Sequence, residues 1–170
     1  MNCLPFEPNI IHKTLAKWED EGLLNAVITQ NIDNLHQKAG SKNVIELHGT
    51  SMKNYCVKWK KEFSAEDIFY GDNDFPVCDE CGNVVRPGIV LYQENLPENA
   101  FSKAERELQK AKTCIVAGTS LTVYPANQLL SYFYGENLVI INKQRVPNEQ
   151  WANIVIHDDM KKVFELLADI

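Results

Sequence analysis

Apolar residues along this chain follow helical spacing in some segments and form short unbroken runs in others. In residues 8–22, Ile11, Leu15 and Trp18 lie at positions i, i+4 and i+7, and Gly22 suits a helix end. This segment is therefore predicted to be an amphipathic helix. The same reasoning predicts a helical turn and three further helices at residues 33–39, 97–112, 125–134 and 159–169.

Short apolar runs lie between these helices and predict buried strands. The runs are residues 23–29, 43–47, 113–117, 137–142 and 153–156. Strand, loop, helix and strand alternate several times, which is typical of a parallel sheet with both faces covered. The sequence therefore predicts the α/β fold class.

Residues 51–85 interrupt this alternation. They are polar and aromatic, carry cysteines and show little periodicity, which is the composition of a small inserted module. We therefore expect two parts: residues 1–50 and 86–170 form the part with the parallel sheet, and residues 51–85 form the module.

The overall composition narrows the classes of partner. The chain has 170 residues, 45% hydrophobic residues and a formal net charge of −6. An acidic surface does not favour nucleic acid or an anionic membrane as a direct partner. The sequence has no run of about 18 apolar residues, so no membrane span is expected. Residues 1–13 lack the basic start and apolar stretch of a signal peptide, which predicts a cytoplasmic location.

Polar residues gather where three of the predicted strands end. The clusters are Thr29 to Asp33, Gly118 to Ser120 and Asn142 to Gln144. Because ligands of parallel sheets bind at the carboxyl ends of the strands, these clusters predict one shared binding site. The first cluster offers two amides and a carboxylate, which can hold ribose hydroxyls and a carboxamide. His48, after the second strand, fits a general base near neutral pH or a structural histidine beside a polar loop.

Six motifs follow one another along the chain. They are Thr29-Gln30-Asn31-Ile32-Asp33-Asn34-Leu35-His36; Ala39-Gly40; Glu46-Leu47-His48-Gly49; Arg86-Pro87 with Ile89-Val90 and Glu94-Asn95-Leu96-Pro97; Gly118-Thr119-Ser120-Leu121 with Val123-Tyr124-Pro125-Ala126; and Ile141-Asn142. In residues and in order they resemble the motifs of the sirtuins, the Sir2-type NAD-dependent protein lysine deacylases. The resemblance covers essentially the whole chain.

The resemblance implies an incomplete Rossmann-like NAD-binding part with a small, degenerate zinc-ribbon module inserted. It implies that His48 is the catalytic base that activates a ribose hydroxyl, that Asn31 orders a water, and that Asp33 holds the nicotinamide carboxamide. The cofactor-binding residues that it implies are Gln30, Asn31, Ile32, Asp33, Gly118, Thr119, Ser120, Asn142, Lys143, Gln144 and Asp159.

The resemblance also implies the substrates. An acylated-lysine protein or peptide would lie as an added strand against Ile89, Val90, Leu91, Tyr92 and Val123. NAD would be consumed as a co-substrate, and the products would be deacylated lysine, nicotinamide and an O-acyl-ADP-ribose. No feature of the sequence indicates the acyl chain, the protein substrate or the oligomeric state.

The cysteines suggest a metal site that lacks one ligand. The chain has five cysteines, and the spacing of Cys78 and Cys81 indicates metal ligands or free thiols rather than a disulfide framework. The family has two such pairs, as tetrahedral structural zinc requires. Here the first pair begins at Cys56, but Trp59 stands where its partner would be. A zinc ion held by Cys56, Cys78 and Cys81 and a module without metal are both left open.

Two departures from the family bear on activity. Tyr92-Gln93-Glu94 stands where the family has Phe-Gly-Glu, so the side chain of Gln93 is expected to narrow the substrate cleft or change its loop. The family's GAG(x)S turn, which holds the NAD pyrophosphate, and its IPDFR stretch have no counterpart in the sequence. We therefore expect a parallel sheet without its first strand, with two exposed edges and reduced stability.

Two alternatives to an active deacylase are considered. The first is a catalytically silent, truncated member of the family that binds at most a peptide or a partner protein. The second is a zinc-ribbon nucleic-acid binder. The pair Cys78 and Cys81 favours the second alternative, but the acidic charge and the missing fourth ligand argue against it.

Overall fold

A computed structural model of the chain describes residues 6–71, 74–97 and 99–168. The first five residues of the segment predicted over 1–50 lie outside the described residues. The end of the helix predicted over 159–169 also lies outside them.

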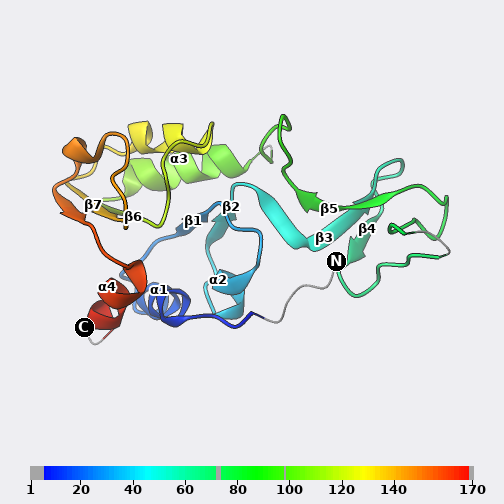
Figure 1. The fold of residues 1–170 in the computed structure, drawn as a ribbon, viewed down its shortest axis with the longest axis horizontal. Helices are drawn as coiled ribbons and strands as arrows, with labels where there is room; N and C mark the ends of the chain where they lie inside the picture. Colours follow the sequence, from blue (N-terminus) through cyan, green and yellow to red (C-terminus); the bar gives the residue numbers. More distant parts are fainter. Residues whose placement is uncertain (1–5, 72–73, 98, 169–170) are drawn as a thin grey trace.

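The parallel strands form two separate sheets (Figure 1). The smaller sheet pairs β1 with β2, and the larger has the order β6-β7-β8. Their bounds are Val27–Thr29 for β1, Val44–Glu46 for β2, Thr113–Ala117 for β6, Asn137–Ile141 for β7 and Ile154–Ile156 for β8. The predicted α/β class with parallel strands is therefore confirmed.

Both parallel sheets have open edges. Among the described residues, no strand pairs with the second edge of β1 or of β6. Ile115 on β6 is 39% exposed, whereas Ile140 on β7, which is paired along both edges, is fully buried. An apolar strand that the sequence predicts to be covered thus keeps part of its surface in contact with solvent.

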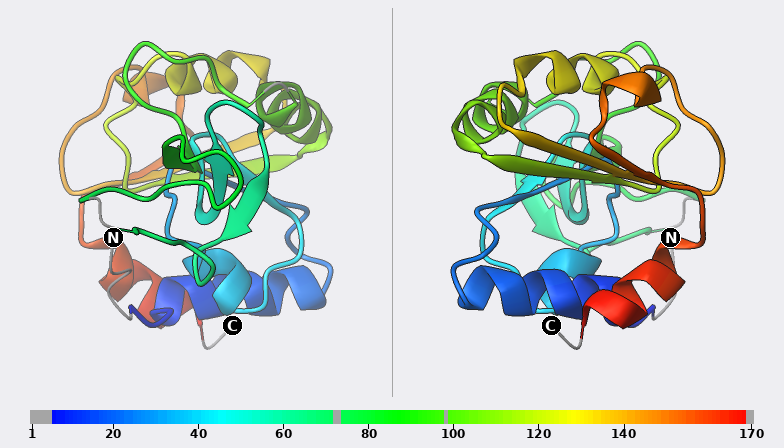
Figure 2. Two further views of the ribbon diagram at one scale, coloured as in Figure 1. Left: turned by 90° about the vertical axis from the view of Figure 1, so that its right-hand side faces the viewer. Right: turned by 90° about the vertical axis from the view of Figure 1, so that its left-hand side faces the viewer.

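A third sheet is antiparallel and has the order β4-β3-β5. It lies beside the parallel part rather than within its layers (Figures 1 and 2). The register of β3 against β5 shifts between Thr50 and Asn54, so this pairing is irregular at its start. The strand bounds are Gly49–Cys56 for β3, Glu62–Ser64 for β4 and Val85–Ile89 for β5.

Helices cover the parallel strands on both faces (Figure 1). One face carries α3 and the 3-10 helix η1, and the other carries α1 and α4. None of the described helices is long and apolar enough to cross a membrane. The helix bounds are Ile10–Asp20 for α1, Leu35–Lys38 for α2, Ala100–Lys110 for α3, Ala126–Tyr132 for η1, Glu149–Trp151 for η2 and Met160–Leu167 for α4.

Two apolar clusters hold these layers together. On one face, Leu47 packs with Leu108 of α3 and Leu129 of η1. On the other face, Ile141 of β7 packs with Phe164 of α4 and with α1. Since each cluster joins a helix to the strands, the burial of apolar area fixes the sheets between the helices.

Local structure differs from the prediction at two places. The strand predicted over residues 23–29 begins only at Val27. The helix α1 ends at Asp20, and the N–H groups of Leu23 and Leu24 instead donate to the carbonyl of Trp18 in its last turn. Leu23 is therefore 74% exposed. The helix predicted over 125–134 is a 3-10 helix.

Candidate active site

The carboxyl ends of β1 and β2 lie side by side and border a hollow of about 450 Å³. The two strands are parallel neighbours, so the loops that follow them leave the sheet at the same edge. The residues that line the hollow are Gln30, Asn31, Ile32, Asp33, His48, Ile89 and Val90. Five of these come from the two loops, and the last two come from the end of β5.

The His48 ring makes one hydrogen bond among the described residues, and this bond determines which ring nitrogen carries the proton. Its Nδ1 lies 3.1 Å from the backbone oxygen of Gln30. A carbonyl oxygen can only accept, so Nδ1 carries the proton and donates it. In the neutral ring the lone pair then lies on Nε2, which has no hydrogen-bond partner among the described residues. His48 therefore presents a basic nitrogen beside the hollow.

The backbone around His48 is fixed between two strands. The Val90 N–H donates to the His48 carbonyl oxygen over 2.9 Å. Gly49 has a φ of +71°, and a Cβ at this position would overlap the carbonyl oxygen of Gly88. Any larger residue at Gly49 would therefore push β5 away from the loop that carries His48.

The loop after β1 is held by bonds from its own backbone and from β3. Ser51 donates twice to the carbonyl oxygen of Ile32, from its N–H over 3.0 Å and from its hydroxyl over 2.7 Å. Asp33 Oδ1 accepts from the N–H of Leu35 over 3.0 Å, so only Oδ2 lacks a partner among the described residues. The exposed side chains of Asn31 and Asp33 are thus presented on an ordered loop.

Two buried histidines lie close enough to Asp33 of this loop to be affected by its charge. The rings of His12 on α1 and His36 on α2 lie 4.7 Å apart between centroids. Burial lowers the pKa of His36, and the nearby His12 lowers it further, against the opposing effect of Asp33. Burial also lowers the pKa of His12. Both rings are therefore favoured as neutral groups in the folded chain.

The second polar cluster follows β6 and meets the first. Thr119 Oγ1 accepts from Gln30 Nε2 over 3.5 Å and from the N–H of Leu121 over 3.2 Å. Gly118 has a φ of +64°, and a Cβ here would lie 2.7 Å from the sulfur of Met160. The left-handed backbone conformation favours glycine at this position, and a Cβ would displace the end of the flexible Met160 side chain. The hydrogen bond from Gln30 connects the two parallel sheets.

The third cluster follows β7 and lies beside the start of α4. Asn142 Nδ2 donates to the carbonyl oxygen of Gln144 over 2.8 Å. Lys143 pairs with Asp159 over 2.9 Å, and Asp159 also caps α4 by accepting from the N–H of Lys161. The hydrogen bond from Lys143 lowers the pKa of the Asp159 carboxyl, so this group is anionic at neutral pH.

His157 joins the third cluster although the sequence reasoning did not select it. Its Nδ1 donates to the carbonyl oxygen of Asn142 over 3.3 Å, and its Nε2 lies 3.5 Å from a carboxylate oxygen of Glu149. His157 directly follows β8, so the rule that polar residues gather at strand ends could have identified it.

The predicted peptide-binding residues are not all brought together. Ile89 and Val90 line the hollow, but Leu91 and Tyr92 form an exposed turn beyond the end of β5. Val123 is also exposed and does not line the hollow. The strand-like peptide wall that the resemblance implies over residues 89–92 is thus present only as far as Val90.

A salt bridge shapes the turn after Val90. Arg86 Nη2 donates to a carboxylate oxygen of Glu94 over 2.9 Å, and the N–H of Leu91 donates to the same carboxylate. The hydrogen bond from Arg86 lowers the pKa of Glu94 to about 2. Gln93 lies between them with a φ of 70°, a conformation that favours glycine.

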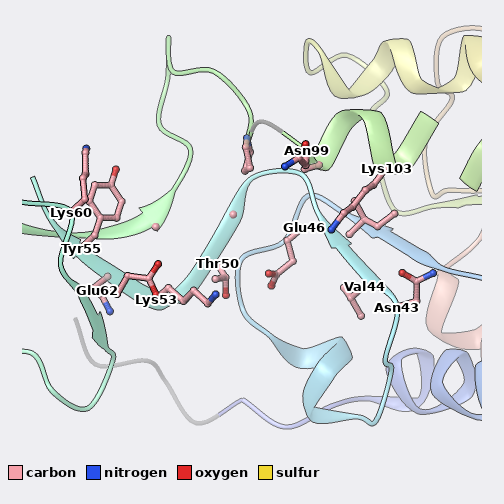
Figure 3. Close-up of a pocket in the computed structure, with 16 residues that line it drawn as sticks. Asn43, Val44, Glu46, Thr50, Lys53, Tyr55, Lys60, Glu62, Asn99 and Lys103 are labelled. Carbon is pink, nitrogen blue, oxygen red and sulfur yellow. The ribbon is translucent and has the colours of Figure 1, made fainter. Parts of the chain in front are cut away.

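A larger hollow of about 710 Å³ lies elsewhere, between β2, β3 and the start of α3 (Figure 3). Glu46, Thr50 and Lys53 point toward its interior, and Lys103 borders it from α3. None of the three strand-end clusters reaches it. The smaller hollow is therefore the better candidate for the active site, because the basic nitrogen and the fixed carboxylate meet there.

The three cysteines of the module lie close together. The Sγ atoms of Cys56, Cys78 and Cys81 are all within 4.8 Å of one another, and those of Cys56 and Cys81 are 3.6 Å apart. Zn–S bonds of about 2.3 Å at tetrahedral angles separate two sulfurs by about 3.8 Å. The three thiols therefore fit three corners of a zinc site.

Comparison with known families gives a match over most of the chain. A family model described as the Sir2 family matches residues 1–125. An NAD-dependent protein deacetylase of Clostridium acetobutylicum is 46% identical over 159 residues, which are 94% of this chain and 65% of that protein. One of Clostridium tetani is 47% identical over 157 residues, which are 92% of this chain and 64% of that protein. The chain thus spans just under two thirds of the length of these relatives.

Solved structures give the same result for the fold. A structure described as Sir2 bound to acetylated peptide superposes with a TM-score of 0.93 and 41% identity, covering 98% of this chain and 72% of that one. A complex described as Sir2-p53 peptide-NAD+ also has a TM-score of 0.93, with 42% identity, covering 98% of this chain and 71% of that one.

Proposed function

The chain belongs to the Sir2 family, and from this premise we propose that it acts as an NAD-dependent protein lysine deacylase. The reaction converts an acylated lysine and NAD into deacylated lysine, nicotinamide and an O-acyl-ADP-ribose. The observation that carries the proposal is the state of His48. Its Nδ1 donates to the carbonyl of Gln30, which leaves Nε2 as a base beside the hollow.

His48 acts as the general base in this proposal. Nε2 takes the proton of a ribose hydroxyl, and the charge that develops on the ring is stabilised by the hydrogen bond from Nδ1 to the carbonyl of Gln30. The backbone bond between Val90 and His48 keeps the ring in place while the proton moves. A histidine held in this way is pre-organised for the transfer.

Asp33 and Asn31 bind the leaving half of the co-substrate. One Asp33 oxygen is held by the N–H of Leu35, and the other is directed to an amide donor such as the nicotinamide carboxamide. Asn31 offers an amide that can order a water or contact the ribose, and Ile32 gives an apolar side to the same wall. These assignments come from the resemblance to the family, and the support from the structure is that Asn31, Ile32 and Asp33 all line the hollow.

The other strand ends take the adenosine half. Gln30 and Thr119 join the ribose region to the loop after β6, where Gly118 permits close approach and Ser120 adds a hydroxyl. Asn142 follows the next strand of the same sheet, where a ribose would be held. This side also contains the loop with Lys143 and Gln144 and the capping residue Asp159.

The acylated lysine enters between the end of β5 and the loop that follows β6. Ile89 and Val90 form the apolar side next to His48. Leu91, Tyr92 and Val123 supply exposed apolar surface for the rest of the peptide, which would lie alongside as an extended strand. An acylated-lysine protein or peptide is therefore the proposed substrate.

The module has a supporting role in the same proposal. Residues 1–50 and 86–170 form the catalytic part, and residues 51–85 form the small zinc-binding-like module. Cys56, Cys78 and Cys81 would hold a structural zinc ion, which would tie the end of β3 to the turn at residues 78–81. The support is the spacing of the three sulfur atoms.

Nicotinamide release tests the proposal directly. The chain is incubated with NAD and an acetyl-lysine peptide, and nicotinamide is measured by chromatography. Nicotinamide should appear only when both substrates are present. The same peptide with an unmodified lysine is the matched control, and it should give no release above background.

Peptide binding separates the deacylase from the silent alternative. Binding of the labelled acetyl-lysine peptide is followed by fluorescence anisotropy in the same samples. Retained peptide binding without nicotinamide release would overturn the deacylase proposal and favour a module that binds peptide only. The observation that favours this alternative is that β1 and β6 each have an edge that pairs with no described strand.

A further inference from the structure

Ser51 holds the loop after β1 by a side-chain bond in addition to a backbone bond. Its N–H donates to the carbonyl oxygen of Ile32 over 3.0 Å. Its hydroxyl donates to the same oxygen over 2.7 Å. A carbonyl oxygen has two lone pairs, and a single donor already satisfies it as a hydrogen-bond acceptor. The second donor therefore restricts the orientation of this peptide group beyond what folding requires.

An irregularity in β3 places Ser51 against this loop. Thr50 pairs with β5, and the next residue that does so is Asn54. Pairing with β4 begins at Lys53. Among the described residues Ser51 thus pairs with neither neighbouring strand, and its N–H and hydroxyl bond to Ile32 instead. Bulges of this kind re-aim a side chain next to a functional site.

Only two side chains between β2 and the end of β3 bond to the loop after β1, within the described part of the chain. One is His48, whose Nδ1 donates to the carbonyl oxygen of Gln30 over 3.1 Å. The other is Ser51. Since His48 is the proposed base, Ser51 is the side chain whose bond to the loop can be removed without changing the base.

The peptide group that Ser51 holds leads directly to Asp33. A trans peptide is planar, so two donors on the Ile32 carbonyl also fix the direction in which the chain enters Asp33. On the other side, the N–H of Leu35 donates to Asp33 Oδ1 over 3.0 Å. The carboxylate that lines the hollow is thus positioned from both of its chain neighbours.

We propose that the Ser51 hydroxyl is a positioning group for the nicotinamide half of NAD, because it fixes the peptide group that carries Asp33 into the hollow. This role rests on the proposed function, in which Asp33 holds the nicotinamide carboxamide. Without the hydroxyl, the Ile32 peptide group keeps one donor but can tilt, and the Asp33 carboxylate has to be ordered when NAD binds. The loss should therefore fall on NAD affinity and leave the base unchanged.

Binding of two ligands tests this role without turnover. The full chain is titrated with NAD and with ADP-ribose by isothermal titration calorimetry, with no peptide present. ADP-ribose lacks the nicotinamide, so it measures the rest of the site. Ser51→Ala should weaken NAD binding about fivefold, which is the effect of one lost hydrogen bond, and should leave ADP-ribose binding within about twofold of the wild type.

Matched variants separate the hydroxyl from the shape of the side chain. Ser51→Thr keeps a hydroxyl, whereas Ser51→Val has nearly the same shape as threonine without one. The first should bind NAD as the wild type does, and the second should resemble Ser51→Ala. Ser131→Ala is the control, because Ser131 also donates to a backbone carbonyl over 2.7 Å but lies on η1 and does not line the hollow. It should change the affinity for neither ligand.

Steady-state kinetics should show the same separation. In the nicotinamide-release assay, Ser51→Ala should raise KM for NAD about fivefold. The rate at saturating NAD and its pH profile should stay those of the wild type, because His48 keeps its bond to Gln30. A general loosening of the fold would instead lower the saturated rate as well.

Three results would overturn the role of Ser51 alone: equal NAD affinity in Ser51→Ala and the wild type, equal weakening of NAD and ADP-ribose, or wild-type affinity in Ser51→Val. A wild type that does not bind NAD would overturn the proposed function together with this role. If the wild type binds NAD but releases no nicotinamide, the deacylase proposal fails, and the binding results still decide the role of Ser51. The variants should remain folded, because the N–H of residue 51 still satisfies the Ile32 carbonyl.

Discussion

In the parallel part, His48 and Asp33 lie on loops after neighbouring strands, whereas in the module three thiols lie on turns of one antiparallel sheet. The first arrangement depends on helices that pack on both faces of the strands. The second depends on two equivalent turns, at residues 56–60 and 78–82. The module therefore holds its three thiols together with two short turns, whereas the parallel part needs packed helices to hold the loops of His48 and Asp33.

The parallel part is held together least firmly where its two sheets meet. Gln30 and Thr119 connect the sheets by a hydrogen bond of 3.5 Å, which is long for such a bond. β1 and β6 each have an edge that pairs with no described strand. The loops that line the hollow are thus well ordered by themselves, but their position relative to the loop after β6 is weakly held.

Removal of the base should have the largest effect on activity. His48→Ala is expected to lower nicotinamide release about 100- to 10,000-fold, because it removes the only histidine among the described residues that line the hollow, which is the proposed general base. The rate is measured at saturating NAD and peptide. Circular dichroism should show an unchanged fold, because His48 is only partly buried. Equal rates for the variant and the wild type would remove His48 from its proposed role.

Two phenylalanine truncations test whether the regions are independent. Phe164→Ala in the parallel part and Phe63→Ala in the module should each cost about 3–5 kcal/mol, because both side chains are buried. Hydrogen exchange should rise in α1 and β7 for the first variant and in β3 and β5 for the second. A uniform rise across the chain in either variant would show that the two regions unfold together.

Two left-handed residues give a smaller, stabilising effect. Gln93, in the turn near the candidate site, has a φ of 70°, and Lys60, in the module, has a φ of 59°. Gln93→Gly and Lys60→Gly should each stabilise the chain by about 0.5–1 kcal/mol, the relief of strain less the entropy that glycine loses. Thermal unfolding measures both.

Peptide affinity then distinguishes the two glycine variants. Only Gln93→Gly should change it, because only Gln93 lies next to the proposed peptide groove. A similar change in Lys60→Gly would mean that the module and the groove are coupled.

The smallest expected effect is the pH dependence of the histidine pair. His12 and His36 have a pKa below 6.5 in the folded chain, mainly because they are buried. The unfolded chain therefore binds more protons, and the stabilising contribution is complete above pH 6.5 and lost as the pH falls toward the folded pKa. The melting temperature should fall between pH 7.5 and 5.5. His36→Phe should reduce this dependence, and an unchanged slope would contradict the assignment.

Much of the fold could be read from local patterns. The strand at residues 113–117 has its predicted bounds, and α1 lies within the predicted 8–22. The predicted strands were less accurate where the backbone N–H groups of apolar residues form hydrogen bonds outside a sheet. Leu23 and Leu24 continue an apolar run, but their N–H groups close the end of α1, so the strand starts later. Leu91 and Tyr92 are likewise apolar, yet the bond from Leu91 to Glu94 turns the chain away from β5.

The sequence by itself determined the family, the fold class and the residues at the strand ends. Motif order and apolar periodicity are local properties of the chain, so they can be read without coordinates. The tertiary structure alone decided that His48 holds its proton on Nδ1 and that Gln30 meets Thr119. It also decided that the turn that begins at Cys56 resembles the turn that begins at Cys78, although Trp59 stands where the second turn has Cys81. The hydrogen bonds of His48 and of Thr119 join them to Gln30, 18 and 89 residues away, and local patterns do not specify such contacts. The likeness of the two turns is a matter of backbone conformation, which residue types alone do not fix.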